Sequence, residues 1–394
     1  MKPRPLDTLV GLCVLVAAFA LFLAIVEVWH VQTDITAHVD FIVRYATGVE
    51  PWAFNFLYYL AVYALAWGSA EPGALLTAAL FLLALSVLAK YAVTRFLLDT
   101  ELAERIPDDR RNHLHGLVTA GTLLLLLAHN LFLRPWINAY LGQFTPNVWH
   151  NSTTIFLMPF ALLLFWSSCR YIERGETRAV ANIGLIALLL AVNVAIKPSF
   201  LLAFAAAWPF VLLWRYGLRS RQFWLGLAPL LLGGGLLAAQ YVHLFLLHPS
   251  NTSGQTTPGV KIAFLHVWPL YSKNIPLSLL ASFFFPLVVV LAYRPRLALG
   301  AQWRWWYAAL LQAVSVAQFA LLTEVGAREA HANFAWQGMI SCYLWFLTSV
   351  AVVLEKELQE RSGIRMWLAA LALLAHVAAG IGYFVVMART GRIG

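Results

Sequence analysis

Long apolar runs separated by short polar segments dominate the chain. A helix needs about 20 predominantly apolar residues to cross the hydrocarbon core of a membrane. We expect such helices near 7–28, 73–96, 114–133, 153–168, 179–196, 199–214, 223–247, 277–293, 305–323, 336–354 and 366–388. The pattern therefore predicts an all-α polytopic membrane protein with about 11 transmembrane helices.

The stretch 54–70, FNFLYYLAVYALAWGSA, is also apolar enough to cross. If it does not cross, most of the 27 Lys and Arg residues lie at cytoplasmic helix ends, Lys90 and Arg95 among them. If it does cross, every later loop changes side and most of the positive charge lies outside. The positive-inside rule favours the first arrangement. We therefore expect 54–70 to be a re-entrant or interfacial juxtamembrane helix in the first outer loop, 29–72.

Composition narrows the class of protein. Of 394 residues, 61% are hydrophobic and 11% are charged, which excludes a soluble domain. The formal charge of +9 does not indicate nucleic acid, because the basic residues gather in short loops. The three cysteines lie in apolar runs or at the end of one, which excludes a disulfide framework and a cysteine-based metal site. The first 28 residues lack a small-residue cleavage site, and we expect them to form a retained helix.

The first outer loop carries the strongest candidates for chemistry. Asp34, His38 and Asp40 lie within seven residues beside an apolar wall. In a helix, Asp34 and His38 lie one turn apart on the same face, so a carboxylate and an imidazole could meet one substrate. Asp40 lies nearly two turns on from Asp34. We take these three as candidate catalytic residues; the alternative is a solvated cap on the first transmembrane helix.

The second outer loop, 134–152, is rich in aromatic and amide side chains. Flat rings beside amides suit the faces and hydroxyls of sugars. The candidate substrate-binding residues are Asn147, Trp149, His150 and Asn151. The alternative is an aromatic belt at the membrane interface.

Basic side chains at the outer edge are candidates for binding a donor phosphate. Lys197 is a lone cation between two apolar runs, and an ionisable residue at that depth indicates function. Snorkelling to ordinary lipid phosphates is the alternative. Arg328 offers a planar fork for a phosphate or diphosphate. The remaining members of this group are Lys261 and Lys273.

Two later outer loops, 248–276 and 324–335, supply further polar side chains. The first reads as a flexible loop that covers a substrate. The substrate-binding candidates in the two loops are His266, Tyr271, Glu324, His331 and Asn333. An ion pair between Glu324 and Arg328 that only closes the last loop is the alternative reading.

These features together resemble the GT-C superfamily of membrane glycosyltransferases. The resemblance lies in TDITAHVD after the first span, the stretch from Gly48 to Leu60, a juxtamembrane helix ending at Gly68, and a second span closing on Lys90, Tyr91 and Arg95. It covers roughly residues 1–276, a catalytic module that the helices of 277–394 would complete. The resemblance implies that an Asp of the first outer loop is the general base, which matches Asp34. The second outer loop has no carboxylate, so we expect neither a metal nor another cofactor.

The resulting hypothesis is an inverting glycosyl transfer at the outer face of a bacterial cytoplasmic membrane. The expected partners are a polyprenyl-phosphate-linked sugar, a lipid or glycan acceptor, and membrane lipids, with no nucleic acid. One rival is an O-antigen or polysaccharide polymerase or ligase that uses a lipid diphosphate, with Arg328 and His331 central. Another is a lipid-linked-sugar flippase or transporter, which should show charges inside the spans and some repeat symmetry.

Overall fold

The structure is a computed structural model of the chain. It describes residues 5–103, 105–106, 111–131, 141–174, 179–243, 259–294, 298–360 and 363–393. Within these residues the fold is almost entirely helical, and the one sheet has two short strands. The all-α prediction is therefore confirmed.

Long helices follow the expected apolar runs. Their bounds are α1 (Pro5–Leu23, continued by the π-helical turn η1, Ala24–Val28), α4 (Pro72–Ala103), α5 (Arg111–Leu127), α6 (Ser152–Arg174), α7 (Ala179–Ile196), α8 (Ser199–Tyr216), α9 (Arg221–Tyr241), α11 (Ile275–Tyr293), α12 (Trp303–Leu321), α13 (Trp336–Glu360) and α14 (Ile364–Thr390). Among the described residues, eight helices are long and apolar enough to cross a membrane; α5, α7 and α12 are not among them. The protein therefore has the helices of an integral membrane protein, while the count of about 11 spans stays a prediction.

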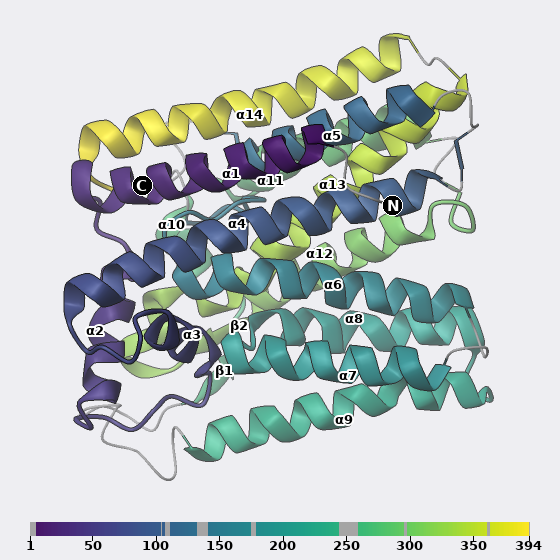
Figure 1. Cartoon of the computed structure of the whole chain (residues 1–394). Coiled ribbons are helices and arrows are strands. Elements are labelled where there is room, and N and C mark those ends of the chain that lie inside the picture. Colours follow the sequence, from purple (N-terminus) through teal and green to yellow (C-terminus); the bar gives the residue numbers. More distant parts are fainter. Residues whose placement is uncertain are drawn as a thin grey trace.

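Short elements gather at one end of the bundle, which we call the α2–α3 end (Figure 1). They are α2 (Asp34–Ala46), α3 (Leu57–Leu65), α10 (Trp268–Tyr271), the 3-10 turns η7 (Gly326–His331) and η8 (Asn333–Ala335), and two strands, β1 (Val260–Ile262) and β2 (Leu322–Glu324). The strands pair antiparallel, with Lys261 opposite Thr323. The nine residues of α3 cover about 14 Å, too short a helix to cross, which supports the non-crossing reading of 54–70.

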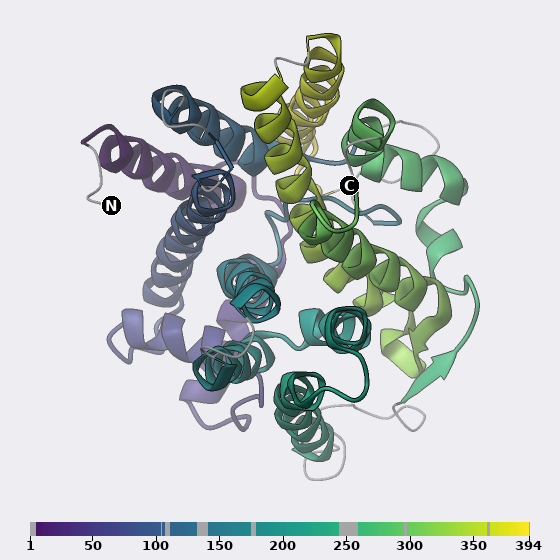
Figure 2. The same cartoon turned by 90° about the vertical axis from the view of Figure 1, so that its right-hand side faces the viewer.

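The long helices pack side by side along one direction. Seen along their axes, the helices do not follow sequence order around the bundle, because α5 packs against both α4 and α14, and α12 packs against α8 (Figure 2). Of the eight candidate spans, α13 and α6 are the most deeply buried. The main buried core includes residues from Leu97 to Leu373. Packing is thus continuous across residue 276, and the proposed division there stays a prediction.

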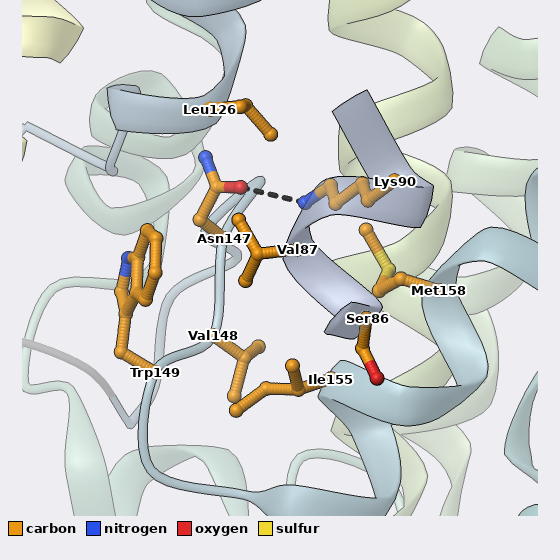
Figure 3. Close-up of a pocket in the computed structure, with 9 residues that line it drawn as sticks. All are labelled: Ser86, Val87, Lys90, Leu126, Asn147, Val148, Trp149, Ile155 and Met158. Carbon is orange, nitrogen blue, oxygen red and sulfur yellow. Dashed lines mark hydrogen bonds between the residues drawn. The ribbon is translucent and has the colours of Figure 1, made fainter. Parts of the chain in front are cut away.

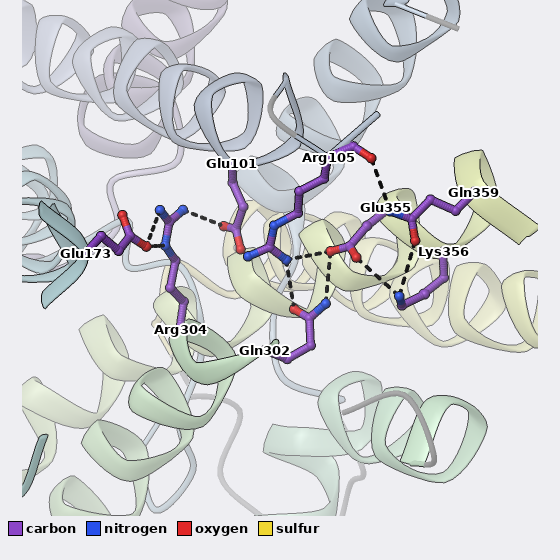
Figure 4. A network of polar contacts seen from close by, with 8 residues as sticks. All are labelled: Glu101, Arg105, Glu173, Gln302, Arg304, Glu355, Lys356 and Gln359. Atoms are coloured by element: carbon purple, nitrogen blue, oxygen red, sulfur yellow. Dashed lines mark hydrogen bonds and ion pairs between the residues drawn. The ribbon is translucent and has the colours of Figure 1, made fainter. Parts of the chain in front are cut away.

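A network of charged and amide side chains ties helices together at the opposite end (Figure 4). Arg304 of α12 pairs with Glu173 of α6 at 2.5 Å, and its guanidinium also lies 3.7 Å from Glu101 of α4. Arg105, just after α4, pairs with Glu355 of α13 at 2.7 Å. Both Glu101 and Glu355 are buried. Because each buried charge has a partner from another helix, the network fixes the ends of four helices relative to one another.

A non-helical segment enters the bundle between α5 and α6. We call residues 141–151 the buried loop, because every residue from Gly142 to Asn151 is buried. Irregular backbone is tolerated at membrane depth only where protein or a cavity surrounds it. The loop meets this condition with bonds to distant elements: Phe144 N donates to Ser282, and Trp268 donates to the Gly142 carbonyl.

Helix α14 crosses the end of α5 at a glycine. Residues 128–131, which follow α5, bond to two other helices: His129 N donates to the His376 carbonyl, and Leu131 N donates to the Ala281 carbonyl. A Cβ at Gly380 would overlap the Leu127 carbonyl oxygen, whereas a Cβ at Gly382 would meet nothing. Only glycine therefore permits the observed approach of α14 to the end of α5.

The paired substitutions Gly380→Ala and Gly382→Ala test this contact. Gly380→Ala should lower the free energy of unfolding by about 1–3 kcal/mol or more, because α14 must move away from the backbone of α5. Gly382→Ala should cost nothing and can add up to about 1 kcal/mol through helix propensity. Thermal unfolding in detergent is the measurement. Equal midpoints for the two variants would contradict the close approach.

Thiol labelling tests the arrangement of the helix ends. Lys273 is exposed just before α11 at the α2–α3 end, and Leu218 is exposed in the turn between α8 and α9 at the other end. In a background without the native cysteines, Lys273→Cys and Leu218→Cys should differ in intact cells. An impermeant reagent should label one and spare the other. Labelling of both or of neither would contradict opposite placement.

Candidate functional site

The N-terminus of α2 places Asp34 at the α2–α3 end of the bundle. Thr33 is the N-cap, and its hydroxyl accepts a hydrogen bond from Ile35 N at 3.3 Å. The Asp34 backbone N donates to the His150 carbonyl at 3.2 Å, which joins α2 to the buried loop. A carboxylate in the first turn of a helix is stabilised by the helix dipole. The N-cap and the hydrogen bond to the buried loop therefore fix the position of this side chain.

Asn151, the last residue of the buried loop, links a carboxylate to an amine. Its Nδ2 donates to Asp34 Oδ2. Its Oδ1 accepts from Lys197 Nζ at 2.9 Å and from Thr154 Oγ1 at 2.7 Å. The amide nitrogen of Asn151 thus faces an acceptor and its oxygen faces donors, which fixes the orientation of the amide. Asp34 Oδ1 accepts no hydrogen bond from the described residues, so this oxygen can face a substrate.

Lys197 sits on an aromatic face at the turn between α7 and α8. Its Nζ lies 3.9 Å from the centre of the Trp336 ring and donates to Thr154 Oγ1 at 2.9 Å. The indole face attracts the cation through its quadrupole. We call Asp34, Asn151, Thr154, Lys197 and Trp336 the amide-bridged cluster.

His38 lies one turn along α2 from Asp34, as the sequence predicts, but its closest neighbours are aromatic. Its ring lies 5.6 Å from that of Tyr59 and 5.8 Å from that of Tyr58. Its Nδ1 is buried and has no hydrogen-bond partner in the described part of the chain. Burial, assisted by the charge of Lys197, lowers the pKa of His38 to about 3. The imidazole is therefore neutral near pH 7.

His150 is a second neutral imidazole beside the amide-bridged cluster. It is 3% exposed, and its ring lies 6.1 Å from that of Trp336. Burial, followed by the charge of Lys197, lowers its pKa to about 3. Asn147, Trp149, His150 and Asn151 were expected to bind substrate; all four are buried, and that role stays a prediction. Residues 141–151 satisfy their polar groups inside the bundle.

Lys90 is also displaced from its expected place at a cytoplasmic helix end. It lies within α4, is buried, and contacts the buried loop: Nζ donates to Asn147 Oδ1 at 2.6 Å (Figure 3). Lys90 was expected at the cytoplasmic end of the span 73–96, but α4 continues to Ala103, so Lys90 lies well inside the helix.

A second group of charged residues lies over the β1–β2 pair. Glu329 Oε1 accepts from Lys261 Nζ at 2.6 Å and from His266 Nε2 at 2.7 Å. The hydrogen bond from Lys261 is the largest of the effects that lower the pKa of the Glu329 carboxyl. Lys261 and His266 were expected to contact substrate; here they contact a carboxylate and remain nearly half exposed.

A hollow lies between β2 and η8, next to this group. Glu324, Asn333 and Phe319 are among the residues that line it. Asn333 Nδ2 donates to Glu324 Oε2, and Tyr271 donates to the Ala330 carbonyl. Asn333 lies three residues before Trp336, so this polar group adjoins the amide-bridged cluster along the chain.

The remaining candidates are not brought into the amide-bridged cluster. Asp40, Lys273 and His331 are exposed, and Asp40 makes no hydrogen bond or ion pair with the described residues. The side chain of Arg328, expected to bind a phosphate or to pair with Glu324, lies outside the described residues. Among the described residues, no group of three or more His, Cys, Asp or Glu side chains could hold a metal ion.

Three functional candidates escaped the sequence reading. Trp336 and Thr154 were expected only as parts of transmembrane helices, and Lys90 only as the cytoplasmic end of a span. A lysine, a threonine and a tryptophan far apart in the chain carry no shared spacing, so periodicity gives no signal that they meet.

Comparison with protein-family models, with curated proteins and with solved structures found no match.

The neutral state of His38 makes the stability of the protein depend on pH. Between about pH 6.5 and pH 3, the unfolded chain binds a proton at His38 that the folded chain does not. Stability should therefore be complete above pH 6.5 and fall as pH decreases, by up to about 1.4 kcal/mol per pH unit for this group. His38→Asn should show a shallower decline in thermal midpoint between pH 7 and pH 4.5, measured in detergent.

His331→Asn is the matched control, because His331 is exposed. Its decline should follow that of the parent protein. A His38→Asn profile with the parent's slope would show that burial does not keep this imidazole neutral.

Proposed function

We propose that the protein is a membrane glycosyltransferase that moves a sugar from a polyprenyl-phosphate donor to an acceptor hydroxyl. The observation that supports this most is the amide-bridged cluster. One amide holds a carboxylate, Asp34, and an amine, Lys197, beside each other at one end of a bundle of membrane-type helices. Glycosyl transfer from a lipid phosphate needs a base for the acceptor and a positive charge for the leaving group, near the lipid headgroups.

In this reaction Asp34 is the general base. Asp34 Oδ1 takes the proton of the acceptor hydroxyl as its oxygen forms a bond to the anomeric carbon. The bond between that carbon and the phosphate oxygen breaks, and its electron pair leaves with the phosphate. Lys197 stabilises the charge that develops on this oxygen. Asn151 keeps the carboxylate and the amine apart, so that they do not neutralise each other by direct contact.

The neutral imidazoles fit a positioning role in this proposal. His38 and His150 carry no charge near pH 7, so they add no like charge beside Lys197. His38 would orient an acceptor by a hydrogen bond at Nδ1. The residues of the β1–β2 group, with Arg328, would contact the remaining part of the donor or acceptor.

The proposed location is the outer face of a bacterial cytoplasmic membrane. Eleven spans with a cytoplasmic N-terminus would place the α2–α3 end outside, as the positive-inside rule favours. In the labelling experiment, this orientation requires that Lys273→Cys reacts in intact cells and Leu218→Cys does not.

Transport of a lipid-linked sugar is the second candidate, and Lys90 favours it. A transporter should carry charge inside its spans, and the structure places this lysine deep in α4. The purified protein would then transfer no sugar, but would move a lipid-linked sugar across vesicles.

The decisive experiment measures transfer from short-chain polyprenyl-phosphate sugars in detergent. Asp34→Asn keeps the shape of the side chain but cannot accept a proton, so the rate should fall about 10²–10⁴-fold while donor binding remains. Lys197→Gln should weaken use of the donor, by about 1.5–3 kcal/mol for the lost charged hydrogen bond. Asp40→Asn and Lys273→Gln, both at exposed positions, are the matched controls.

The outcomes separate the three functions. An Asp34→Asn enzyme with the parent's rate would overturn the glycosyltransferase assignment. Loss of turnover in Arg328→Ala or His331→Ala, with a mild effect of Asp34→Asn, would indicate a polymerase or ligase. A parent protein without transfer activity but with transport in vesicles would indicate a flippase.

A further inference from the structure

Lys90 occupies an unusual environment inside the bundle. It is 6% exposed, and no carboxylate of the described residues pairs with it. Its Nζ donates to Asn147 Oδ1 at 2.6 Å and lies 3.5 Å from the Pro146 carbonyl oxygen. The centre of the Tyr343 ring lies 3.7 Å away. An amine buried in protein is tolerated only when such groups replace water, so these contacts define where Asn147 must lie.

Asn147 uses its whole side chain in this contact. While Oδ1 accepts from Lys90, Nδ2 donates to the carbonyl of Leu125 at 2.8 Å and to that of Ala128 at 2.6 Å. The two carbonyls belong to the last turn of α5 and to the residue after it, which the ended helix leaves without intrahelical partners. One amide therefore joins α4, the end of α5 and the buried loop.

The same loop ends four residues later at Asn151, in the amide-bridged cluster. The loop is held at Asn147 by Lys90, and at Asn151 by Asp34, by Lys197 and by the first turn of α6, where Thr154 N donates to Asn151 Oδ1. No helical hydrogen bonds fix the residues between these two points. The position of Asn147 thus limits where Asn151 can lie.

We propose that Lys90 is a positioning residue for the candidate site. Its bond to Asn147 holds the buried loop in the register that presents Asn151 to Asp34 and Lys197. The effect on the loop stands by itself, whereas the effect on sugar transfer rests on the proposed function.

The cavity beside Lys90 supports an anchor rather than a binding site for substrate. Ser86, Val87 and Trp149 are among the residues that line it, with Asn147 and Lys90 on one side (Figure 3). Its space for water is only about 20 Å³, which is room for about one molecule. A sugar or a phosphate does not fit.

Hydrogen exchange of the full-length protein in detergent tests the proposal. Lys90→Met keeps the length of the side chain but removes the amine. Amides of 141–151 should exchange on the order of tenfold faster, because the loop opens more often once the hydrogen bond from Lys90 is lost. Amides of α7 and α8 should keep the parent's rates. Lys356→Met, which removes an amine from the network at the opposite end, is the control and should leave 141–151 unchanged.

Further variants keep the test decisive if Lys90→Met folds poorly. Lys90→Gln keeps a neutral donor and should speed exchange of the loop less than Lys90→Met. Asn147→Leu should loosen 141–151 as Lys90→Met does, and the double variant should add little to either, because both remove the same bond. Unchanged exchange of 141–151 in Lys90→Gln and Asn147→Leu would overturn the proposal.

Kinetics separate this inference from the proposed function. In an active enzyme, Lys90→Met should lower kcat for sugar transfer while KM for the lipid donor stays within about twofold, because Lys197 remains in place. A merely destabilised protein would instead lose active fraction, with kcat per folded molecule unchanged. If Lys90→Met speeds exchange of the buried loop but the parent protein transfers no sugar, the anchoring role of Lys90 is supported and the glycosyltransferase assignment is rejected. A looser loop with unchanged kcat per folded molecule would reject positioning of the site.

Discussion

A backbone without helical hydrogen bonds cannot face lipid, and this constraint governs the centre of the protein. Helix α5 ends at Leu127, and residues 141–151 lead into α6 through the interior. Amides and hydroxyls of the buried loop then satisfy carbonyl groups that the ended helix leaves open, as Asn147 does for Leu125 and Ala128. The remaining helices pack around this segment, and the candidate site lies where it leaves the interior.

Charge is distributed according to the same constraint. At the end of the bundle opposite α2 and α3, the buried carboxylates of Glu355 and Glu101 pair with Arg105 and Arg304. In the interior and at the candidate site, the amines of Lys90 and Lys197 contact amides and aromatic faces instead. Direct ion pairs join the helices at the first end, whereas contacts with amides and aromatic rings hold these two amines in place.

The sequence predicts the fold better than the site. Apolar length locates the long helices, although α4 runs past its expected end, because lipid imposes one dominant requirement. The charge count predicts that 54–70 does not cross, and the short α3 agrees with that prediction. Helical periodicity also places Asp34 and His38 on neighbouring turns of one helix. Burial of 141–151 was not predictable, since a polar, aromatic segment between two apolar runs reads as a surface loop. The contacts of Asn151 with Asp34 and Lys197 join three distant segments, and no local pattern encodes them.

The buried loop also sets the order in which the protein can be completed during synthesis. Thr145 N donates to Met339, and Phe144 packs on Trp268 and Phe319, all of which leave the ribosome long after the loop itself. A nascent chain that has inserted its first six long helices must therefore hold polar residues in a half-built interior until α13 arrives. During that interval the unfinished bundle is a natural target for membrane chaperones and proteases, and its lifetime depends on how quickly the C-terminal helices follow.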